Sequence, residues 1–208
     1  MPLIILIMEV SKIQLSPAEM ELMQNADIIL TKNRVLEKIK SLLETVQQNQ
    51  IGYVQEHNLK NEIFKVSPKI SRGENYLGLP YLILDYPRQS TDNHFFFIRT
   101  MFWWGNFFSC TLHVANNSKQ TFKEKIKQAR RQLSHYYISI NDDAWVHHLE
   151  KLDFERIDQM TDEQFNQACE SFGHIKIAGR HALSQWEQMP SQLFENWKHF
   201  LAVCELIA

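Results

Sequence analysis

Cysteine is scarce in this chain of 208 residues, which has only three, at positions 110, 169 and 204. Their number is odd, no Cys-x-x-Cys pair occurs, and each lies in an apolar pattern. A disulfide framework or a structural zinc site is therefore not expected. We predict three buried free thiols, a reducing compartment and a cytoplasmic location.

An excess of charge of either sign is also missing. The chain has 22 Lys and Arg residues against 24 Asp and Glu residues, which gives a formal net charge of −2. Domains that bind nucleic acid usually carry a marked basic excess, so this balance argues against nucleic acid as a partner. Hydrophobic residues make up 44% and charged residues 22%, which is typical of a globular rather than a disordered protein.

The apolar run near the N-terminus, Leu3–Met8, is short. Its six residues are too few to span a bilayer. No basic residue precedes it and no small-residue cleavage site follows it, unlike in a signal peptide. We expect either a short strand here or a segment that precedes a domain beginning near Ile13, and no membrane partner.

Motifs for catalysis and cofactor binding are missing too. The six glycines form neither a Gly-x-Gly-x-x-Gly nor a Walker loop, the nine histidines form no metal-ligand motif, and Gly-x-Ser-x-Gly does not occur. The nearest Cys–His pair, Cys110 and His113, has opposite parity on a strand, so its side chains would point to opposite faces. No cofactor and no metal are therefore expected, and enzyme status stays open.

What the chain does contain is a regular order of helices and strands. Ser16-Pro17-Ala18-Glu19 is typical of a helix start, and Thr31 caps a second helix with an apolar stripe. These two helices are expected to form an antiparallel pair in an N-terminal lobe spanning about 16–50. Strands are expected near residues 81–86, 94–104, 107–115 and 136–140.

The pattern predicts one α+β domain over 1–208, with a sheet core at about 60–150 and a helical C-terminal part at about 158–208. The central sheet is expected to be mainly antiparallel, with helices from both ends of the chain packing on one face. The segments 144–152 and 175–186 fit either a strand or a helix.

The most unusual stretch is an aromatic-rich hairpin over residues 94–115. A two-residue turn at Gly105-Asn106 would pair Trp104 with Phe107 and Ile98 with His113. One face would then be almost purely apolar, apart from Arg99. The other face would mix aromatic side chains with hydroxyl groups and imidazoles.

This mixed face allows two interpretations. It is either a second core layer, which is the commoner reason for apolar patterning, or a site for a small, partly apolar ligand or a second copy of the chain. A small-molecule-binding or self-associating module, with a homodimer as one outcome, is the leading functional hypothesis. The candidate ligand-binding residues are Phe96, Arg99, Phe102, Trp104 and His113.

Arg99 has two explanations of its own. A buried guanidinium needs an acidic partner, and Asp85, Asp142 and Asp143 are the candidates. Alternatively, Arg99 fixes a small anionic substrate, with a nearby His or Asp (His113 and Asp85) serving an enzyme. The predicted pairing weakens this enzyme hypothesis, because it puts Arg99 and His113 on opposite faces.

A weaker alternative is nucleic-acid contact through the basic helix 119–131. Its lysines and arginines lie on one flank of an apolar stripe, as they do in many solvent-exposed helices.

Overall fold

The computed structural model describes residues 14–207. The chain divides into two compact units, Met1–Ile39 and Lys40–Ala208, and helix α3 (Ala26–Glu56) continues through the boundary. The short strand expected at Leu3–Met8 lies outside the described residues. The single domain expected from the sequence stays a prediction.

In the first unit, helix α2 (Pro17–Gln24) begins where the sequence predicts. The Ser16 hydroxyl accepts a hydrogen bond from the Glu19 N–H, and the Glu19 carboxylate accepts one from the Ser16 N–H. Only Asn25 separates α2 from α3, so α3 begins earlier than the start expected at Thr31. Because no residue of α2 (Pro17–Gln24) is buried, the predicted antiparallel helical pair is wrong.

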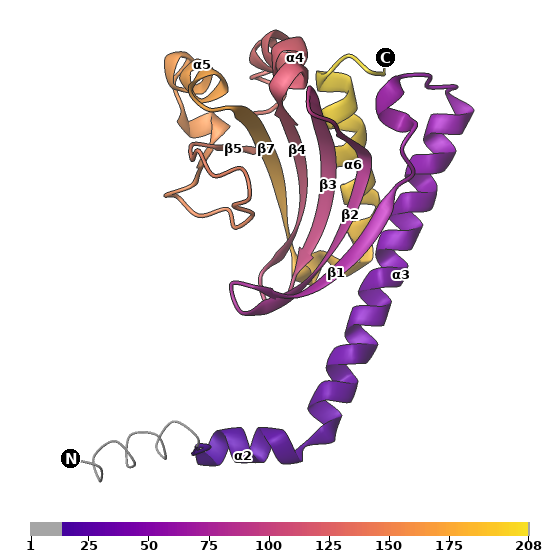
Figure 1. Ribbon diagram of the computed structural model, residues 1–208, viewed down its shortest axis with the longest axis vertical. Coiled ribbons are helices and arrows are strands. Elements are labelled where there is room, and N and C mark those ends of the chain that lie inside the picture. The colour runs from indigo at the N-terminus through magenta and orange to yellow at the C-terminus, as the bar shows by residue number, and fades with distance from the viewer. Residues whose placement is uncertain (1–13, 208) are drawn as a thin grey trace, which may run out of the picture. The chain divides into compact units, whose positions relative to one another are not determined.

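In the second unit, the strands of residues 40–207 form one seven-stranded antiparallel sheet in the order β1-β2-β3-β4-β7-β5-β6 (Figure 1). This confirms the predicted α+β fold with an antiparallel central sheet. The strands are β1 (Lys69–Tyr76), β2 (Leu79–Ser90), β3 (His94–Trp103), β4 (Phe107–Ala115), β5 (Tyr137–Ser139), β6 (Phe154–Arg156) and β7 (His174–Ala182). The helices after α3 are η1 (Glu62–Phe64), α4 (Asn116–Gln128), η2 (Ile157–Gln159), α5 (Asp162–Ser171), η3 (Leu183–Gln188) and α6 (Met189–Val203).

The two segments left open by the sequence fold differently from each other. Residues 175–186 form most of β7 and then enter η3, whereas residues 144–152 contain turns and no strand or helix. Strand β7 lies between β4 and β5 in the sheet, so it does not pair with β6, the strand that precedes it in sequence.

The register of the β3–β4 hairpin differs from the prediction by one residue. Trp103, not Trp104, pairs with Phe107, so the connection has three residues, with Gly105 at φ +72°. The left-handed backbone of Gly105 is typical of such loops. A shift of one residue moves every β4 side chain to the other face relative to β3. His113 therefore pairs with Phe97 and shares a face with Arg99, which corrects the opposite placement expected from the sequence.

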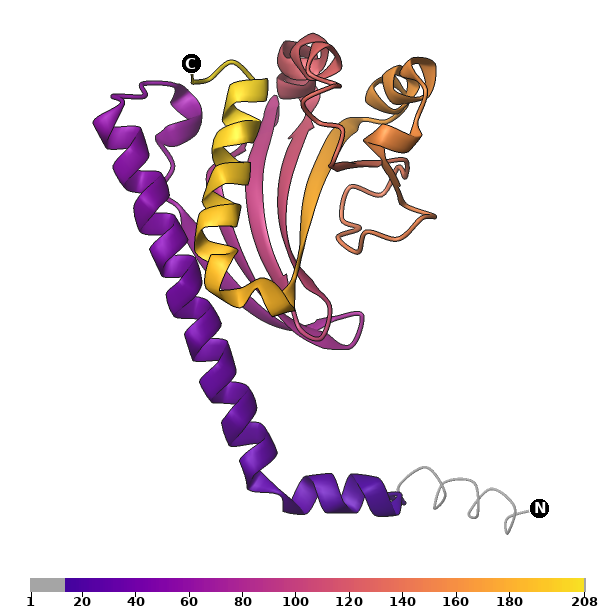
Figure 2. The same cartoon turned by 180° about the vertical axis from the view of Figure 1, so that it is seen from behind.

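One face of the sheet, which we call the helix face, is covered by α4 and α6. Phe96 packs against Phe122 of α4 with ring centroids 5.1 Å apart, and Trp197 of α6 donates its indole N–H to the Tyr86 carbonyl at 2.7 Å. Figure 2 shows α6 in front of the sheet from this side. The other helix-face residues of the hairpin are Ile98, Thr100, Phe102, Phe108, Cys110, Leu112 and Val114.

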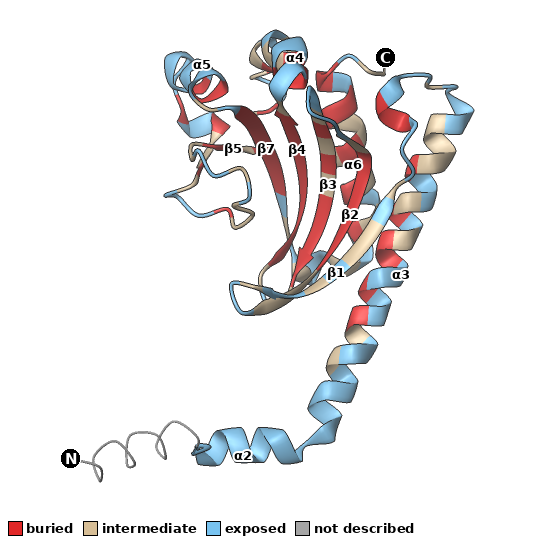
Figure 3. Cartoon of the chain, in the orientation of Figure 1, coloured by how far each residue is buried: buried red, intermediate tan, exposed pale blue. Residues whose placement is uncertain are grey.

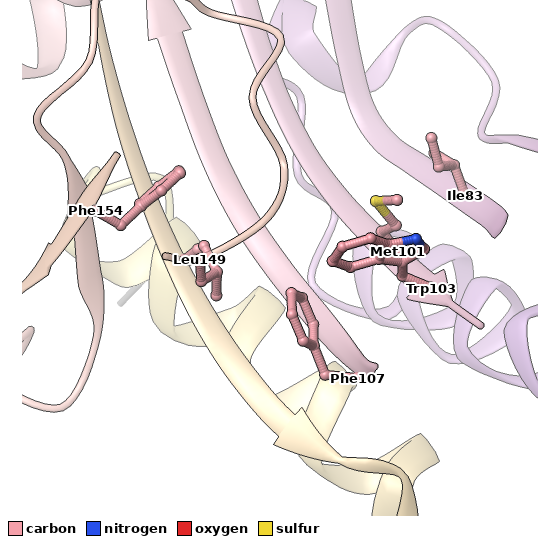
Figure 4. Packing of buried hydrophobic residues seen from close by; sticks show 7 residues of the cluster. Ile83, Met101, Trp103, Phe107, Leu149 and Phe154 are labelled. Carbon is pink, nitrogen blue, oxygen red and sulfur yellow. The ribbon is translucent and has the colours of Figure 1, made fainter. Parts of the chain in front are cut away.

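The opposite face, which we call the loop face, is partly covered by the segment 141–153. Leu149 of this segment joins a buried cluster with Met101, Trp103 and Phe107 (Figure 4). Burial on both faces explains why β3, β4 and β7 are mostly red in Figure 3. The loop-face residues of the hairpin beyond this cluster are Phe95, Phe97, Arg99, Ser109, Thr111, His113 and Ala115.

Candidate functional site

Beyond the apolar cluster, the loop face has a small, largely filled pocket with a cavity volume of about 10 Å³, which is room for about one water molecule. We call it the loop-face pocket. Strands β3, β4 and β7 form its floor, and the segment 141–153 contributes its cover. It is lined by Phe95, Phe97, Arg99, Thr111, His113, Trp145, His147 and Lys176.

Arg99 is held in this pocket by Asp85, its cross-strand neighbour on β2. Its Nε and Nη2 atoms donate to Oδ1 and Oδ2 of Asp85 at 2.8 and 2.9 Å. The two side chains are only 18% and 11% exposed. This two-pronged pair is the structural partnership that the sequence analysis offered as one explanation of Arg99, with Asp85 as the partner rather than Asp142 or Asp143.

The ring of His147 lies between Arg99 and Lys176. Its Nε2 atom is 3.1 Å from Nη1 of Arg99, and its Nδ1 atom is 3.2 Å from Nζ of Lys176. Burial first, and then the charges of Lys176 and Arg99, lower the pKa of His147 to about 2. The ring is therefore uncharged at neutral pH and can accept at only one of its two nitrogens.

Lys176 is buried to 1% exposure and extends toward the covering segment. Its amine donates to the backbone carbonyl groups of Ala144, at 3.0 Å, and Val146. Burial and the nearby Arg99 charge lower the pKa of Lys176 to about 7, although Asp143 acts in the opposite direction. This lysine consequently changes charge near neutral pH, which an exposed lysine does not.

Two more histidines stand beside Lys176. His113 is its cross-strand partner on β4, and His174 lies two residues before it on β7. Burial lowers the pKa of His113 to about 2 and that of His174 to about 4. Each Nε2 atom is buried and has no hydrogen-bond partner within residues 14–207. An unpartnered buried nitrogen is costly, so a ligand that reached Nε2 of His113 would gain a hydrogen bond at little cost.

Tyr76, on β1, fixes the covering segment over the pocket. Its hydroxyl oxygen accepts the backbone N–H groups of His147 and His148 at 2.6 and 3.1 Å, and its O–H lies 3.0 Å from Nδ1 of His148. The other ring nitrogen of His148 is 2.9 Å from Oδ2 of Asp153. The position of His147 in the pocket therefore depends on a tyrosine from the far edge of the sheet.

Replacing Tyr76 with phenylalanine tests this dependence. We expect a loss of about 1–3 kcal/mol in the free energy of unfolding, because two backbone N–H groups lose their acceptor. Amide hydrogen exchange should also speed up in residues 141–153 more than in β3 or β4. Tyr53→Phe, which removes a hydroxyl group on α3, is the matched control. Equal exchange rates in the two variants would contradict this role of Tyr76.

The structure brings together only two of the five residues predicted for the site. Arg99 and His113 line the loop-face pocket. Phe96 and Phe102 are buried on the helix face, at 0% and 4% exposure, and Trp104 lies in the hairpin loop beside Phe102. The sequence analysis did not predict Lys176 or His147 for the site.

Comparison of the chain with family models, curated proteins and solved structures gives no match. The site must therefore be interpreted from its own chemistry. Residues 14–207 contain no group of three or more His, Cys, Asp or Glu side chains that could hold a metal ion. None of the helices in this described part is long and apolar enough to cross a membrane.

The basic flank of α4 is largely paired with acidic groups. Lys123 and Lys127 of α4 both contact the Glu170 carboxylate. The helix ends at Gln128, short of the predicted 131, and Arg130 beyond it pairs with Asp162 at 2.9 Å. The amine of Lys119 is turned inward and donates to the carbonyl groups of Glu170 and Phe172. These pairs reduce the positive charge available for nucleic acid, so the loop-face pocket is the stronger candidate site.

Proposed function

We propose that the protein binds a small, partly apolar anion in the loop-face pocket and acts as a cytoplasmic small-molecule-binding module. The observation that carries this proposal is that two residues lining the loop-face pocket have hydrogen-bonding groups without a partner within residues 14–207. Arg99 has five N–H groups, of which three are used by Asp85 and His147, so two are left for a ligand. His113, whose Nε2 atom has no hydrogen-bond partner within residues 14–207, lines the same pocket.

The walls of the pocket support the apolar part of the proposal. The rings of Phe95 and Phe97 are 4.6 Å apart, and Phe95 lies at the same distance from the His113 ring. The cavity volume of about 10 Å³ is far below the roughly 300–1,000 Å³ of pockets for drug-sized ligands, so the covering segment 141–153 would have to shift to admit even a small ligand. The ligand we propose is therefore a small carboxylate or phosphate with a short apolar group. All three cysteines are free and buried, in keeping with a reducing compartment.

The second candidate is an enzyme acting on a small anionic substrate. The observed register favours it, because Arg99 and His113 share one face, with Lys176 opposite His113. The obstacle raised by the sequence-based pairing is thus removed.

Isothermal titration with small carboxylates and with inorganic phosphate tests the binding proposal. We expect Arg99→Lys to weaken binding at least about tenfold, because lysine keeps the charge but loses the planar fork that holds an anion. Trp104→Ala is the matched control and should bind as tightly as the unmodified chain, since Trp104 lies outside the pocket. Unchanged affinity in Arg99→Lys, or an equal loss in Trp104→Ala, would contradict the proposal.

Native mass spectrometry of the purified chain complements the titration. Extra mass that disappears on denaturation would identify a bound small molecule directly. The same spectrum reports whether the homodimer allowed for by the sequence forms.

A further inference from the structure

We propose that the amine of Lys176 reacts with a small 2-oxo acid in the loop-face pocket and forms an imine. This inference rests on the proposed function, because the carboxylate of the 2-oxo acid is the anion that Arg99 would hold. It goes further by assigning a covalent step and a substrate class to a residue that the binding proposal does not use.

The hydrogen bonds around His147 indicate that Lys176 is uncharged in this arrangement. Arg99 is always protonated, so its Nη1 atom can only donate, and Nε2 of His147 must accept. The neutral ring then carries its hydrogen on Nδ1, which faces Nζ of Lys176. An uncharged amine matches these partners, since its two N–H groups meet the carbonyl groups of Ala144 and Val146 and its lone pair accepts from Nδ1. An ammonium group would instead direct a third N–H at another N–H.

The surroundings of Lys176 also favour the uncharged form of its amine. Nζ forms no salt bridge with a carboxylate of residues 14–207, and the nearest fixed cation is Arg99. Burial next to another cation is a known way to turn lysine into a nucleophile at neutral pH. Its lowered pKa, about 7, agrees with this count of donors and acceptors. The titratable and charged groups that face it are Arg99, His113, Asp143, His147 and His174.

The groups around Lys176 favour a 2-oxo acid over other small carbonyl compounds as the reaction partner. In such an acid the carboxylate and the reactive carbonyl are adjacent. Arg99 and Lys176 contact opposite nitrogens of the His147 ring, so a molecule that bridges them would have to lie beside this ring. The spare N–H groups of Arg99 would hold the carboxylate, with the carbonyl carbon directed at Nζ. His113, across from Lys176, would hydrogen-bond to the bound acid.

The reaction is balanced without an oxidant or a reductant. The Nζ lone pair leaves its hydrogen bond with Nδ1 of His147 and forms a bond to the carbonyl carbon, and the C=O electron pair moves to oxygen. His147 gives its Nδ1 proton to this oxygen and regains one from the nitrogen, which leaves a neutral carbinolamine. A second transfer of the same kind releases the oxygen as water and leaves a C=N bond. One amine and one carbonyl thus become one imine and one water.

Reductive trapping of the whole chain tests the inference. The protein is incubated near neutral pH with pyruvate and cyanoborohydride, and its intact mass and peptides are then measured. We expect one main adduct, heavier by the mass of pyruvic acid minus one oxygen atom, at Lys176. Exposed Lys151 serves as an internal reference, and its modification should be at least about tenfold lower. Lys176→Met should abolish the main adduct, while peptide mapping of the unmodified sequence gives the result even if this variant folds poorly.

Lactate, which has a hydroxyl group where pyruvate has a carbonyl, separates the two proposals. Lactate binding without a pyruvate adduct at Lys176 would overturn the covalent step and leave the binding function standing. Adducts spread evenly over the surface lysines would also overturn the proposed covalent step at Lys176. Absence of both lactate binding and a pyruvate adduct would overturn both proposals.

Discussion

Asp85→Ala is expected to lower the free energy of unfolding by about 3–5 kcal/mol, because it leaves the buried Arg99 guanidinium without its counter-charge. The pair has two short hydrogen bonds and little exposure, so water cannot easily replace the carboxylate. Urea denaturation, followed by circular dichroism, measures the change. A loss below about 1 kcal/mol would show that Arg99 does not depend on Asp85.

Two further variants test whether the unpaired charge of Arg99, rather than lost packing, destabilises Asp85→Ala. The double variant Asp85→Leu with Arg99→Met should recover most of the lost stability, since no unpaired charge remains. Asp158→Ala, which breaks the much more exposed pair with Arg156, should change stability little. If the loop-face pocket binds anions, added acetate should also restore part of the stability of Asp85→Ala.

The second large effect concerns pH. We expect the free energy of unfolding to rise by about 2 kcal/mol between pH 7 and pH 8.5 because of Lys176, at about 1.4 kcal/mol per pH unit. The pKa of Lys176 is about 7 in the folded chain and that of a free lysine is 10.5, so the unfolded chain binds the extra proton in this range. Stability therefore increases with pH, starting near the folded pKa.

The pH range over which stability rises ends where the cysteines begin to lose protons in the unfolded chain. Burial raises the pKa of Cys110, Cys169 and Cys204 to about 12 from 9, so above about pH 9 the unfolded chain loses protons that the folded chain keeps, and stability falls. Urea denaturation at half-unit steps of pH measures the rise. Lys176→Met should remove it, and a flat profile for the unmodified chain would show that Lys176 is not the titrating group.

The hairpin shows how far the sequence could predict this site. The alternation of residues 94–115 is sufficient to predict two paired strands and to place Arg99 in the interior. The register depends on the loop, and a two-residue turn at Gly105-Asn106 predicts a pairing that is off by one residue. Tight two-residue turns favour Asn-Gly, and the reversed order fits the longer loop that forms. This difference of one residue in loop length decides whether Arg99 and His113 share a face of the sheet.

Lys176 and His147 were missed for a different reason. A lysine in a strand usually marks an exposed face, and a segment without periodic structure gives no indication of what it covers. Burial of Lys176 depends on carbonyl groups of residues 144 and 146, about 30 positions earlier in the chain. Contacts of this kind are set by the tertiary fold and leave no local pattern in one sequence.

The place of β7 in the sheet has a consequence for how the chain folds during synthesis. The strands β1 to β4 leave the ribosome in order and can pair as each one appears. β7 then inserts between β4 and β5, and about four-fifths of the chain precedes it. Until then the edge of β4 has unpaired backbone groups and exposed aromatic residues, a state prone to aggregation. The strand that carries Lys176 thus completes the floor of the pocket and also ends the period in which the nascent chain is most vulnerable.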